Sequence, residues 1–177
     1  MFGRMLIAMV LVCAVAGQAR AEEWMNGIKP GARYSFHQPM QSDLGAFHGV
    51  AIEGLLIDWA APGDSVGSGY GRVYFAMDLL YSTRGRGMLE SYSGGLALSL
   101  ERNPMRNFLI PFWAIEIGGL TQKLTGAEFA LQPFLGFTIL AYRRLTLDLA
   151  AGYLLPAGHF RELHGLRARA GLTVSFW

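Results

Sequence analysis

The sequence predicts an all-β protein, an eight-stranded antiparallel transmembrane β-barrel. Three observations lead to this fold class. Apolar and polar side chains alternate with a period of two through most of the chain, and the polar members are mostly small while the apolar members are large. Only 16% of the 177 residues are charged, against about 25% in average globular chains. A membrane barrel has this inverted pattern, because its apolar side chains face lipid and its polar ones line the lumen.

The first 21 residues predict a cleaved signal peptide. Residues 1–4 form a short positive segment, residues 5–16 form an apolar run, and Ala19-Arg20-Ala21 fits the small-x-small cleavage rule. The apolar run is too short for a helix that spans a bilayer. The chain is therefore expected to consist of a signal peptide, residues 1–21, and an outer-membrane β-barrel domain, residues 22–177.

Processing gives a first testable prediction. We expect the intact mass of the membrane-bound protein to match a chain that begins at Glu22, because cleavage should follow Ala21. A membrane form that retains Met1, or recovery of the protein from the soluble periplasm, would contradict this export route.

The single cysteine, Cys13, would be removed with the signal peptide, which excludes disulfide scaffolds and cysteine chemistry from the mature chain.

Eight period-two segments are expected to form the strands. The alternation is clearest at the C-terminus, where every second position from Leu166 to Phe176 is apolar. In the second segment the apolar parity switches near Gly54, which predicts a β-bulge. Gly-, Pro- and Asn-containing breaks separate most of the segments. The expected strands cover residues 30–37, 46–59, 69–81, 89–101, 107–119, 126–141, 144–155 and 165–177.

A soluble sandwich or barrel is the alternative for strands of this period. Its water-facing positions should be rich in Lys and Glu, whereas the polar positions here are small residues with isolated charges. Aromatic residues near the strand ends are typical of the interfacial girdles of membrane barrels. These aromatic residues are Tyr34, Tyr81, Phe108, Trp113, Phe129, Tyr142, Tyr153 and Phe176.

The chain ends on Phe176 and Trp177. Outer-membrane barrels characteristically end in an aromatic residue that the barrel assembly machinery reads. In this respect the mature chain resembles the small eight-stranded bacterial outer-membrane proteins of the OmpA/OmpX type, although Phe176 rather than Trp177 shares the apolar parity. The resemblance implies a cell outer-membrane location in a Gram-negative envelope, contact with outer-membrane lipid and lipopolysaccharide, and recognition by the assembly machinery through Phe176 and Trp177. It is architectural and implies no particular activity.

Charged residues at lumen-facing positions predict an ion network inside the barrel. Each buried ion needs a partner, and eight strands leave an interior just wide enough for side chains. A salt-bridged, largely plugged lumen is therefore expected, with a narrow, porin-like gated channel as the alternative. The predicted members are Arg33, Glu53, Arg72, Asp78, Glu101, Glu116, Glu128, Asp148, Arg167 and Arg169.

A second alternative is a lipid A-modifying enzyme, since the deacylase and palmitoyltransferase barrels have a similar size and location. The candidate catalytic residues are His37, Ser82 and Asp78. The deacylase pattern, a Ser two residues after the catalytic His, is missing after each of the four histidines. No metal site and no cofactor is expected, and the charge balance argues against nucleic acid as a partner.

The fifth and sixth segments suggest a lateral gate. A hairpin centred near residue 122 would place Pro111 opposite Pro133 and Glu116 opposite Glu128. Neither proline can donate to the ladder, so the wall would be weakened at one level. An interrupted ladder there would let an acyl chain enter from the side. The sequence favours a structural, envelope-integrity or anchoring role over this enzymatic one.

Overall fold

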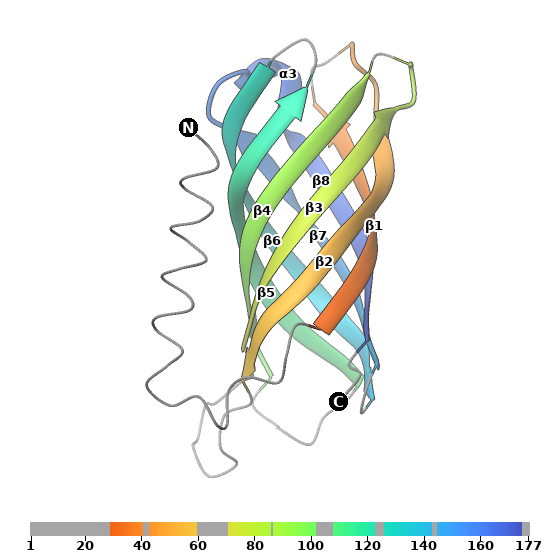
Figure 1. Ribbon diagram of the computed structural model, residues 1–177, viewed down its shortest axis with the longest axis vertical. Helices are drawn as coiled ribbons and strands as arrows, with labels where there is room; N and C mark the ends of the chain where they lie inside the picture. Colours follow the sequence, from red (N-terminus) through yellow and green to blue (C-terminus); the bar gives the residue numbers. More distant parts are fainter. Residues whose placement is uncertain are drawn as a thin grey trace.

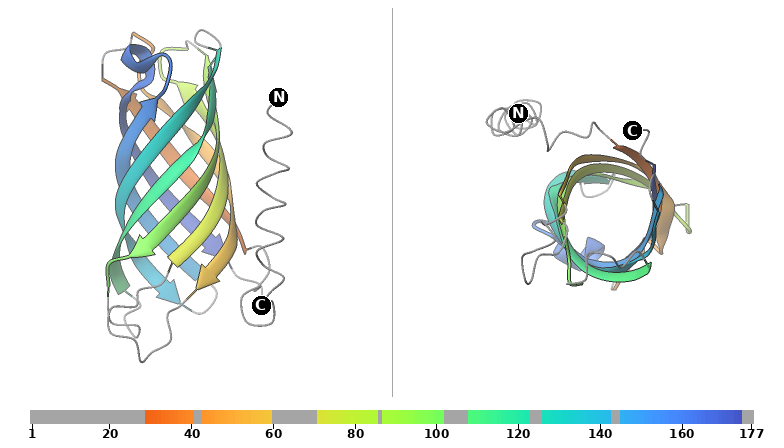
Figure 2. Two further views of the ribbon diagram at one scale, coloured as in Figure 1. Left: turned by 90° about the vertical axis from the view of Figure 1, so that its left-hand side faces the viewer. Right: turned by 90° about the horizontal axis from the view of Figure 1, so that it is seen from below.

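The protein forms a closed antiparallel barrel in the computed structural model, which describes residues 29–40, 43–59, 71–85, 87–101, 108–122, 126–142 and 145–174. Each strand pairs with the next, and β1 also pairs with β8, so the sheet closes into a ring (Figures 1 and 2). The strands are β1 (Lys29–Pro39), β2 (Phe47–Trp59), β3 (Gly71–Ser82), β4 (Met88–Ser99), β5 (Phe108–Gln122), β6 (Gly126–Tyr142), β7 (Leu145–Pro156) and β8 (Gly165–Val174).

The barrel has two distinct ends. At one end, which we call the terminal end, β1 begins and β8 finishes (Figure 1). The opposite end, the loop end, carries the short helix α3 (Phe160–Leu163) between β7 and β8. The predicted signal peptide and the residues Phe176 and Trp177 lie outside the described part of the chain. Among the described residues, no helix is long and apolar enough to cross a bilayer.

The eight predicted strands are confirmed, with small changes at their ends. The pairing of β2 with β3 shifts register between Leu55 and Ile57, so the predicted bulge exists slightly beyond Gly54. A second register shift, which was not predicted, lies in β6 between Thr138 and Leu140. Each bulge inserts one extra residue into its strand. The side chains beyond it therefore point to the opposite face from the one that uninterrupted alternation would give them.

Side chains alternate between the interior and the outer surface along each strand. In β3, Tyr74 and Asp78 are buried, whereas Phe75 and Tyr81 are exposed. This is the alternation that the period-two pattern predicts, with the charged parity inside and the large apolar parity outside. The interior therefore contains polar groups that require partners, and the outer wall is largely apolar.

Two apolar clusters lie inside the barrel, one towards each end. Each cluster takes its strand residues mainly from the segments nearest to one end of the barrel. The terminal-end cluster consists of Leu55, Tyr74, Ala97, Phe112, Ala114, Phe134 and Ala150. The loop-end cluster, which we call the apolar plug, consists of Leu44, Phe47, Leu80, Leu89, Leu120, Ala130, Leu154 and Leu163. The buried charges lie mainly between these clusters.

The β5–β6 hairpin has a different register from the one predicted. β5 continues to Gln122, which pairs with Gly126, so the hairpin is centred two residues later than expected. Gly126 adopts a positive φ of 80°, a conformation that glycine accepts without strain, and it starts β6 directly after the loop. As a result Glu116 faces Gln132, and the predicted opposition of Glu116 and Glu128 is wrong.

The register on which the predicted lateral gate between β5 and β6 depends is also wrong. Pro111 pairs with Phe137 and Pro133 pairs with Ile115, so the two prolines lie at different levels. The β5–β6 ladder is continuous from Ile110 to Gln122. The prolines lie at different levels because the centre of the hairpin lies two residues later than predicted. The weak point that two opposed prolines would have created for an acyl chain is therefore not formed at this seam.

Each proline instead turns its missing donor towards its other neighbouring strand. The carbonyl oxygen of Pro111 accepts from the N–H of Leu100, just beyond the end of β4, at 2.8 Å. The carbonyl oxygen of Pro133 faces Gly152 of β7. In the β6–β7 pairing, Gln132 and Pro133 have no paired residue on β7. The missing hydrogen bonds are therefore distributed over two different seams of the barrel.

Candidate functional site

Arg33 of β1 lies in the middle of the barrel and contacts acids from three other strands. Its guanidinium donates to both carboxylate oxygens of Asp78, at 3.3 and 2.8 Å, and to both of Glu116, at 2.8 and 3.3 Å. A longer contact of 3.4 Å reaches Glu53 of β2. Because the planar guanidinium presents several donors at fixed angles, one side chain links β1, β2, β3 and β5.

Side chains from several other strands contact the carboxylate of Asp78 in β3. The hydroxyls of Ser35 and Ser91 donate to its carboxylate at 2.6 and 2.9 Å, and Arg167 of β8 forms an ion pair with it at 2.9 Å. Arg167 also donates to Gln132 of β6. The Asp78 and Arg167 side chains are almost completely buried, so these contacts replace the water that each charge loses on folding.

Glu116 of β5 is the second acidic centre. It accepts hydrogen bonds from the hydroxyls of Tyr74 and Ser93, at 2.9 and 3.2 Å, and forms an ion pair with Arg169 of β8. The Arg169 guanidinium lies over the Phe134 ring, 4.1 Å from its centre. This stacking covers the face of the guanidinium that makes no hydrogen bonds.

These groups form one connected set, which we call the interior network. Its charged members come from β1, β2, β3, β5 and β8, and its neutral partners lie on the same strands and on β4 and β6. A network in which each charge has at least one opposite partner avoids the cost of an isolated buried ion. The members are Arg33, Glu53, Asp78, Glu116, Arg167 and Arg169, with Ser35, Tyr74, Ser91, Ser93 and Gln132.

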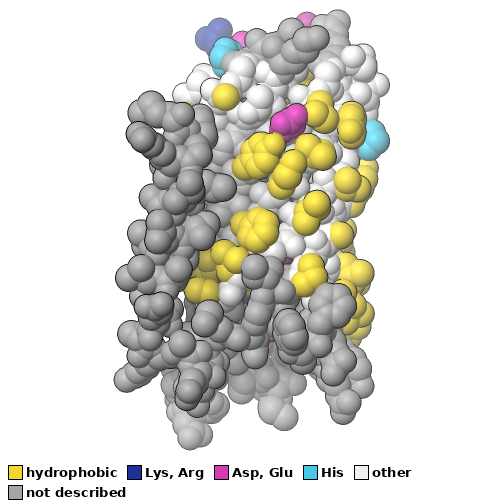
Figure 3. All heavy atoms as spheres, viewed as in Figure 1, with side chains coloured by type: hydrophobic (Ala, Val, Ile, Leu, Met, Phe, Trp, Pro, Cys, Tyr) yellow, Lys and Arg dark blue, Asp and Glu magenta, His cyan; other side chains and the backbone are white. Residues whose placement is uncertain are grey.

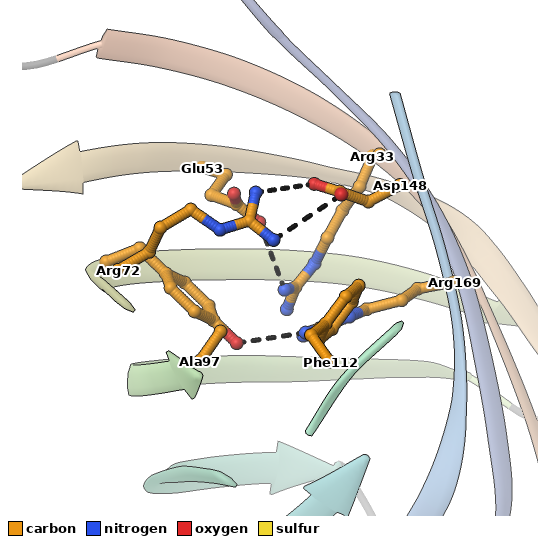
Figure 4. Close-up of a pocket in the computed structure, with 9 residues that line it drawn as sticks. Arg33, Glu53, Arg72, Ala97, Phe112, Asp148 and Arg169 are labelled. Carbon is orange, nitrogen blue, oxygen red and sulfur yellow. Dashed lines mark hydrogen bonds and ion pairs between the residues drawn. The ribbon is translucent and has the colours of Figure 1, made fainter. Parts of the chain in front are cut away.

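A small cavity borders the interior network on its terminal-end side. Its water-accessible volume is about 20 Å³, room for one or two water molecules. Arg72 of β3 and Asp148 of β7 form an ion pair of 2.7 Å in its wall. Figure 4 shows this pair beside Arg33, Glu53 and Arg169, all directed into the same space. The cavity is thus lined by charges that already pair with one another.

Among the described side chains in the middle of the barrel and beside the cavity, the charges balance. Four arginines, Arg33, Arg72, Arg167 and Arg169, pair with four carboxylates, Glu53, Asp78, Glu116 and Asp148. These are eight of the ten predicted interior ions, and the structure brings all eight together. An equal number of opposite charges in a narrow, water-poor space favours mutual pairing over the capture of a mobile ion. The arrangement can cross-link strands, and it fills the space through which an ion would have to pass.

The other two predicted ions lie elsewhere. Glu101 follows the end of β4, where its backbone N–H donates to the Ser99 hydroxyl at 3.0 Å. Glu128 lies near the loop end of β6 and contacts the segment that carries α3. Their parity is the same as that of the network members, but their positions along the barrel axis keep them apart from it.

The three candidate catalytic residues make separate contacts. The Ser82 hydroxyl donates to the carbonyl oxygen of Leu44 at 2.5 Å, and Nδ1 of His37 lies 3.2 Å from the carbonyl oxygen of Leu166. Asp78 belongs to the interior network. The register explains the separation. Phe47 of β2 pairs with His37 of β1 on one side and with Ser82 of β3 on the other, so a whole strand lies between His37 and Ser82. No His–Ser–Asp hydrogen-bond chain connects these residues.

Several network members were not predicted. Tyr74, Ser91, Ser93 and Gln132 share the lumen-facing parity of the charged residues, and that parity was the signal that would have identified them. The apolar plug was missed for a different reason. Two of its members lie outside the strands, Leu44 in the β1–β2 loop and Leu163 in α3, so no strand period marks their buried face.

Comparisons with known proteins give no relative on which to base a function. No family model, no curated protein and no solved structure matches this chain. Within the described ranges, no group of three or more His, Cys, Asp or Glu side chains is arranged to hold a metal ion. The geometry of the barrel and its interior therefore carries the functional argument.

Proposed function

We propose that this protein is an outer-membrane β-barrel with a salt-bridged, plugged lumen and a structural role in the cell envelope. In this proposal it stabilises the membrane or anchors a larger assembly, as a member of the small eight-stranded barrels of the OmpA/OmpX type. Its partners are outer-membrane lipid and lipopolysaccharide, and the assembly machinery would recognise Phe176 and Trp177. The observation that carries the proposal is the inversion of polarity, with charge inside and apolar surface outside.

The outer wall supports a lipid environment. Large apolar side chains are exposed around the barrel, and Ile52 and Leu135 each reach 66% exposure. Figure 3 shows hydrophobic side chains predominating over charged ones on the face formed by β2, β3 and β4. Contiguous apolar surface of this extent is uncommon on soluble monomers. We call the following residues the apolar belt: Tyr34, Phe36, Val50, Ile52, Phe75, Tyr81, Tyr92, Ile117, Phe129, Leu135, Phe137, Leu149, Leu166 and Leu172.

Charged groups are rare on the same surface. Among the described side chains of the strands, Glu90 of β4 is the charged group with outward parity, and it accepts from the Tyr92 hydroxyl at 3.3 Å. A soluble barrel would gain solubility from many such charges on its outer face. In lipid, each charge near the middle of the wall would instead be destabilising, so their scarcity favours the membrane proposal.

The interior supports a structural role over transport. The apolar plug fills the loop end, the interior network fills the middle, and the bordering cavity has space for only one or two water molecules. An open pore requires a continuous wet path, and these packed layers interrupt it. The separation of His37, Ser82 and Asp78 likewise gives the enzymatic alternative no assembled site.

The proposal predicts an absence of both transport and lipid chemistry. We expect the purified protein in planar bilayers to give no stepwise conductance, because the plug and the network fill the lumen. A general porin inserted under the same conditions provides the positive control. We also expect identical lipid A mass spectra from cells with and without the protein, while loss of the protein increases leakage of periplasmic markers. Regular conductance steps would favour a channel, and a lipid A mass change restored by the wild-type protein would favour an enzyme.

A further inference from the structure

The segment between β7 and β8 covers the loop end of the barrel. It contains α3 (Figures 1 and 2). The Leu163 side chain is fully buried as part of the apolar plug, while Phe160 remains 46% exposed. The segment therefore has an inner apolar face that seals the interior and an outer face in contact with solvent. We call residues 157–164 the lid.

The lid is attached to the barrel at both of its ends. At its start, Ala157 donates its N–H to the carbonyl oxygen of Phe129 at 2.8 Å. At its end, the His164 carbonyl oxygen accepts from the N–H of Met40 at 3.0 Å. The His164 ring also shares a 2.6 Å hydrogen bond with the Tyr153 hydroxyl. These contacts fix the two ends and leave the central part to be held by other groups.

Glu128 of β6 holds the lid just before α3. Its Oε2 atom accepts from the backbone N–H groups of Gly158 and His159, each at 2.8 Å. Gly158 suits this approach, because a Cβ at that position would lie 2.8 Å from the same oxygen and Glu128 would have to shift. The Glu128 side chain is only 7% exposed, so it is a buried acceptor committed to the lid rather than a solvated surface charge.

The second oxygen of Glu128 is left for a titratable partner. Oε1 is buried and has no hydrogen-bond partner among the described residues, and it lies 3.7 Å from Nδ1 of His159. Histidine changes charge between about pH 5 and pH 8. The His159 ring is half-exposed, and a charged ring in this position would place a cation beside the carboxylate oxygen that lacks a partner.

We propose that the lid is a pH-sensitive closure of the loop end, in which Glu128 is the latch and protonation of His159 tightens it. When His159 becomes charged, the 3.7 Å contact turns into a charge-assisted hydrogen bond, and the lid is held on both oxygens of Glu128. Mild acid therefore closes the lid more firmly and keeps Leu163 in the apolar plug. This inference concerns the loop end alone and does not depend on the lipid environment of the wall.

Other charged and titratable groups surround the lid, and their contacts differ from that of His159. They are Glu128 of β6, Tyr153 of β7, His37 of β1, Arg167 of β8 and, in the lid itself, Arg161, Glu162 and His164. The His164 ring stacks on Phe160 with 4.4 Å between ring centres and shares its hydrogen bond with Tyr153. The Tyr153 hydroxyl can donate or accept, so it can remain bonded when His164 is protonated. His159 is thus the histidine whose protonation adds a contact to the latch.

Hydrogen exchange on the full-length folded protein tests the proposal directly. We expect the protection factors of the Gly158 and His159 amides, each corrected for the intrinsic rate at its own pH, to rise at least threefold between about pH 8 and about pH 5.5. The H159Q variant should lose this rise and keep the same barrel fold, because the substituted side chain is half-exposed. Protection factors that are independent of pH in the wild-type protein, or an unchanged rise in H159Q, would overturn the proposal.

Two further variants separate the latch from general effects. H48Q removes an exposed histidine from the outer wall and should leave the rise unchanged. E128Q keeps an acceptor oxygen but loses the charge, so the rise should disappear and Gly158 should exchange faster at both pH values. Slow exchange of β5–β6 amides verifies that each variant is folded. A pH-dependent rise that persists in folded E128Q would assign the effect to another group and refute the latch.

Discussion

Replacement of Arg33 by methionine is expected to lower the free energy of unfolding by about 3–5 kcal/mol, the largest effect of any single interior substitution. Methionine fills a similar volume but leaves Asp78 and Glu116 without the donors that Arg33 supplies at 2.8 Å to each. Urea unfolding in lipid vesicles, followed by tryptophan fluorescence, measures the change. A loss below about 0.5 kcal/mol would show that the interior network contributes little to stability.

A double-mutant cycle identifies the origin of this loss. Glu116→Gln alone should also destabilise the barrel, because Arg33 and Arg169 then lose a charged partner. Since Arg33 and Glu116 contact each other directly, the combined variant should lose less stability than the sum of the two single variants. Strict additivity would mean that the two side chains act independently. Arg72→Met is a useful comparison, because Arg72 pairs with Asp148 at the more exposed edge of the interior and should cost less.

Replacement of Leu135 by arginine is expected to cost about 2–4 kcal/mol if the apolar belt lies in lipid. Leu135 lies near the middle of β6, points outward with 66% exposure, and pairs with Trp113 and Ala151 on the two neighbouring strands. An exposed arginine at this position would be nearly neutral in water, so the cost arises from hydrocarbon around the barrel. Reversible urea unfolding in vesicles compares the variant with the wild-type protein.

Leu166→Arg provides the matched control. Leu166 is also an outward-facing leucine, 56% exposed, but it lies at the loop end of β8, close to the expected membrane surface. Charges near the interface cost about 0–1 kcal/mol, so this variant should remain close to the wild-type stability. Equal and small costs at both positions would contradict a membrane-spanning wall and would favour the soluble alternative.

The sequence was sufficient to predict the strands and the direction in which their side chains point. Strand parity is a local property, because consecutive side chains point to opposite faces whatever the rest of the chain does. For this reason Arg33, Asp78 and Glu116 could be assigned to the interior, and Leu135 to the outer wall, from the alternation alone. The number of strands followed in the same way, since each is bounded by breaks in the pattern.

The β5–β6 register could not be predicted with the same accuracy. The turn was placed two residues too early, because Leu120, Thr121 and Gln122 read as part of a loop although they continue β5. A hairpin register depends on the centre of its turn, so this difference moved Pro111 away from Pro133 and Glu116 away from Glu128. The parity of these residues stayed correct because the register moved by an even number of positions.

The sequence by itself determined which side chains face inward, the charges that would need partners, and the apolar character of the outer wall. Only the tertiary structure decided which charges meet, how the loop end is sealed, and where the missing proline donors lie. Arg33 can reach Glu116, 83 residues away, because closure of the sheet brings β1 and β5 to opposite sides of one narrow interior. Leu163 enters the apolar plug because the lid folds over the barrel mouth. Such contacts join residues remote in the chain, so no local period can encode them.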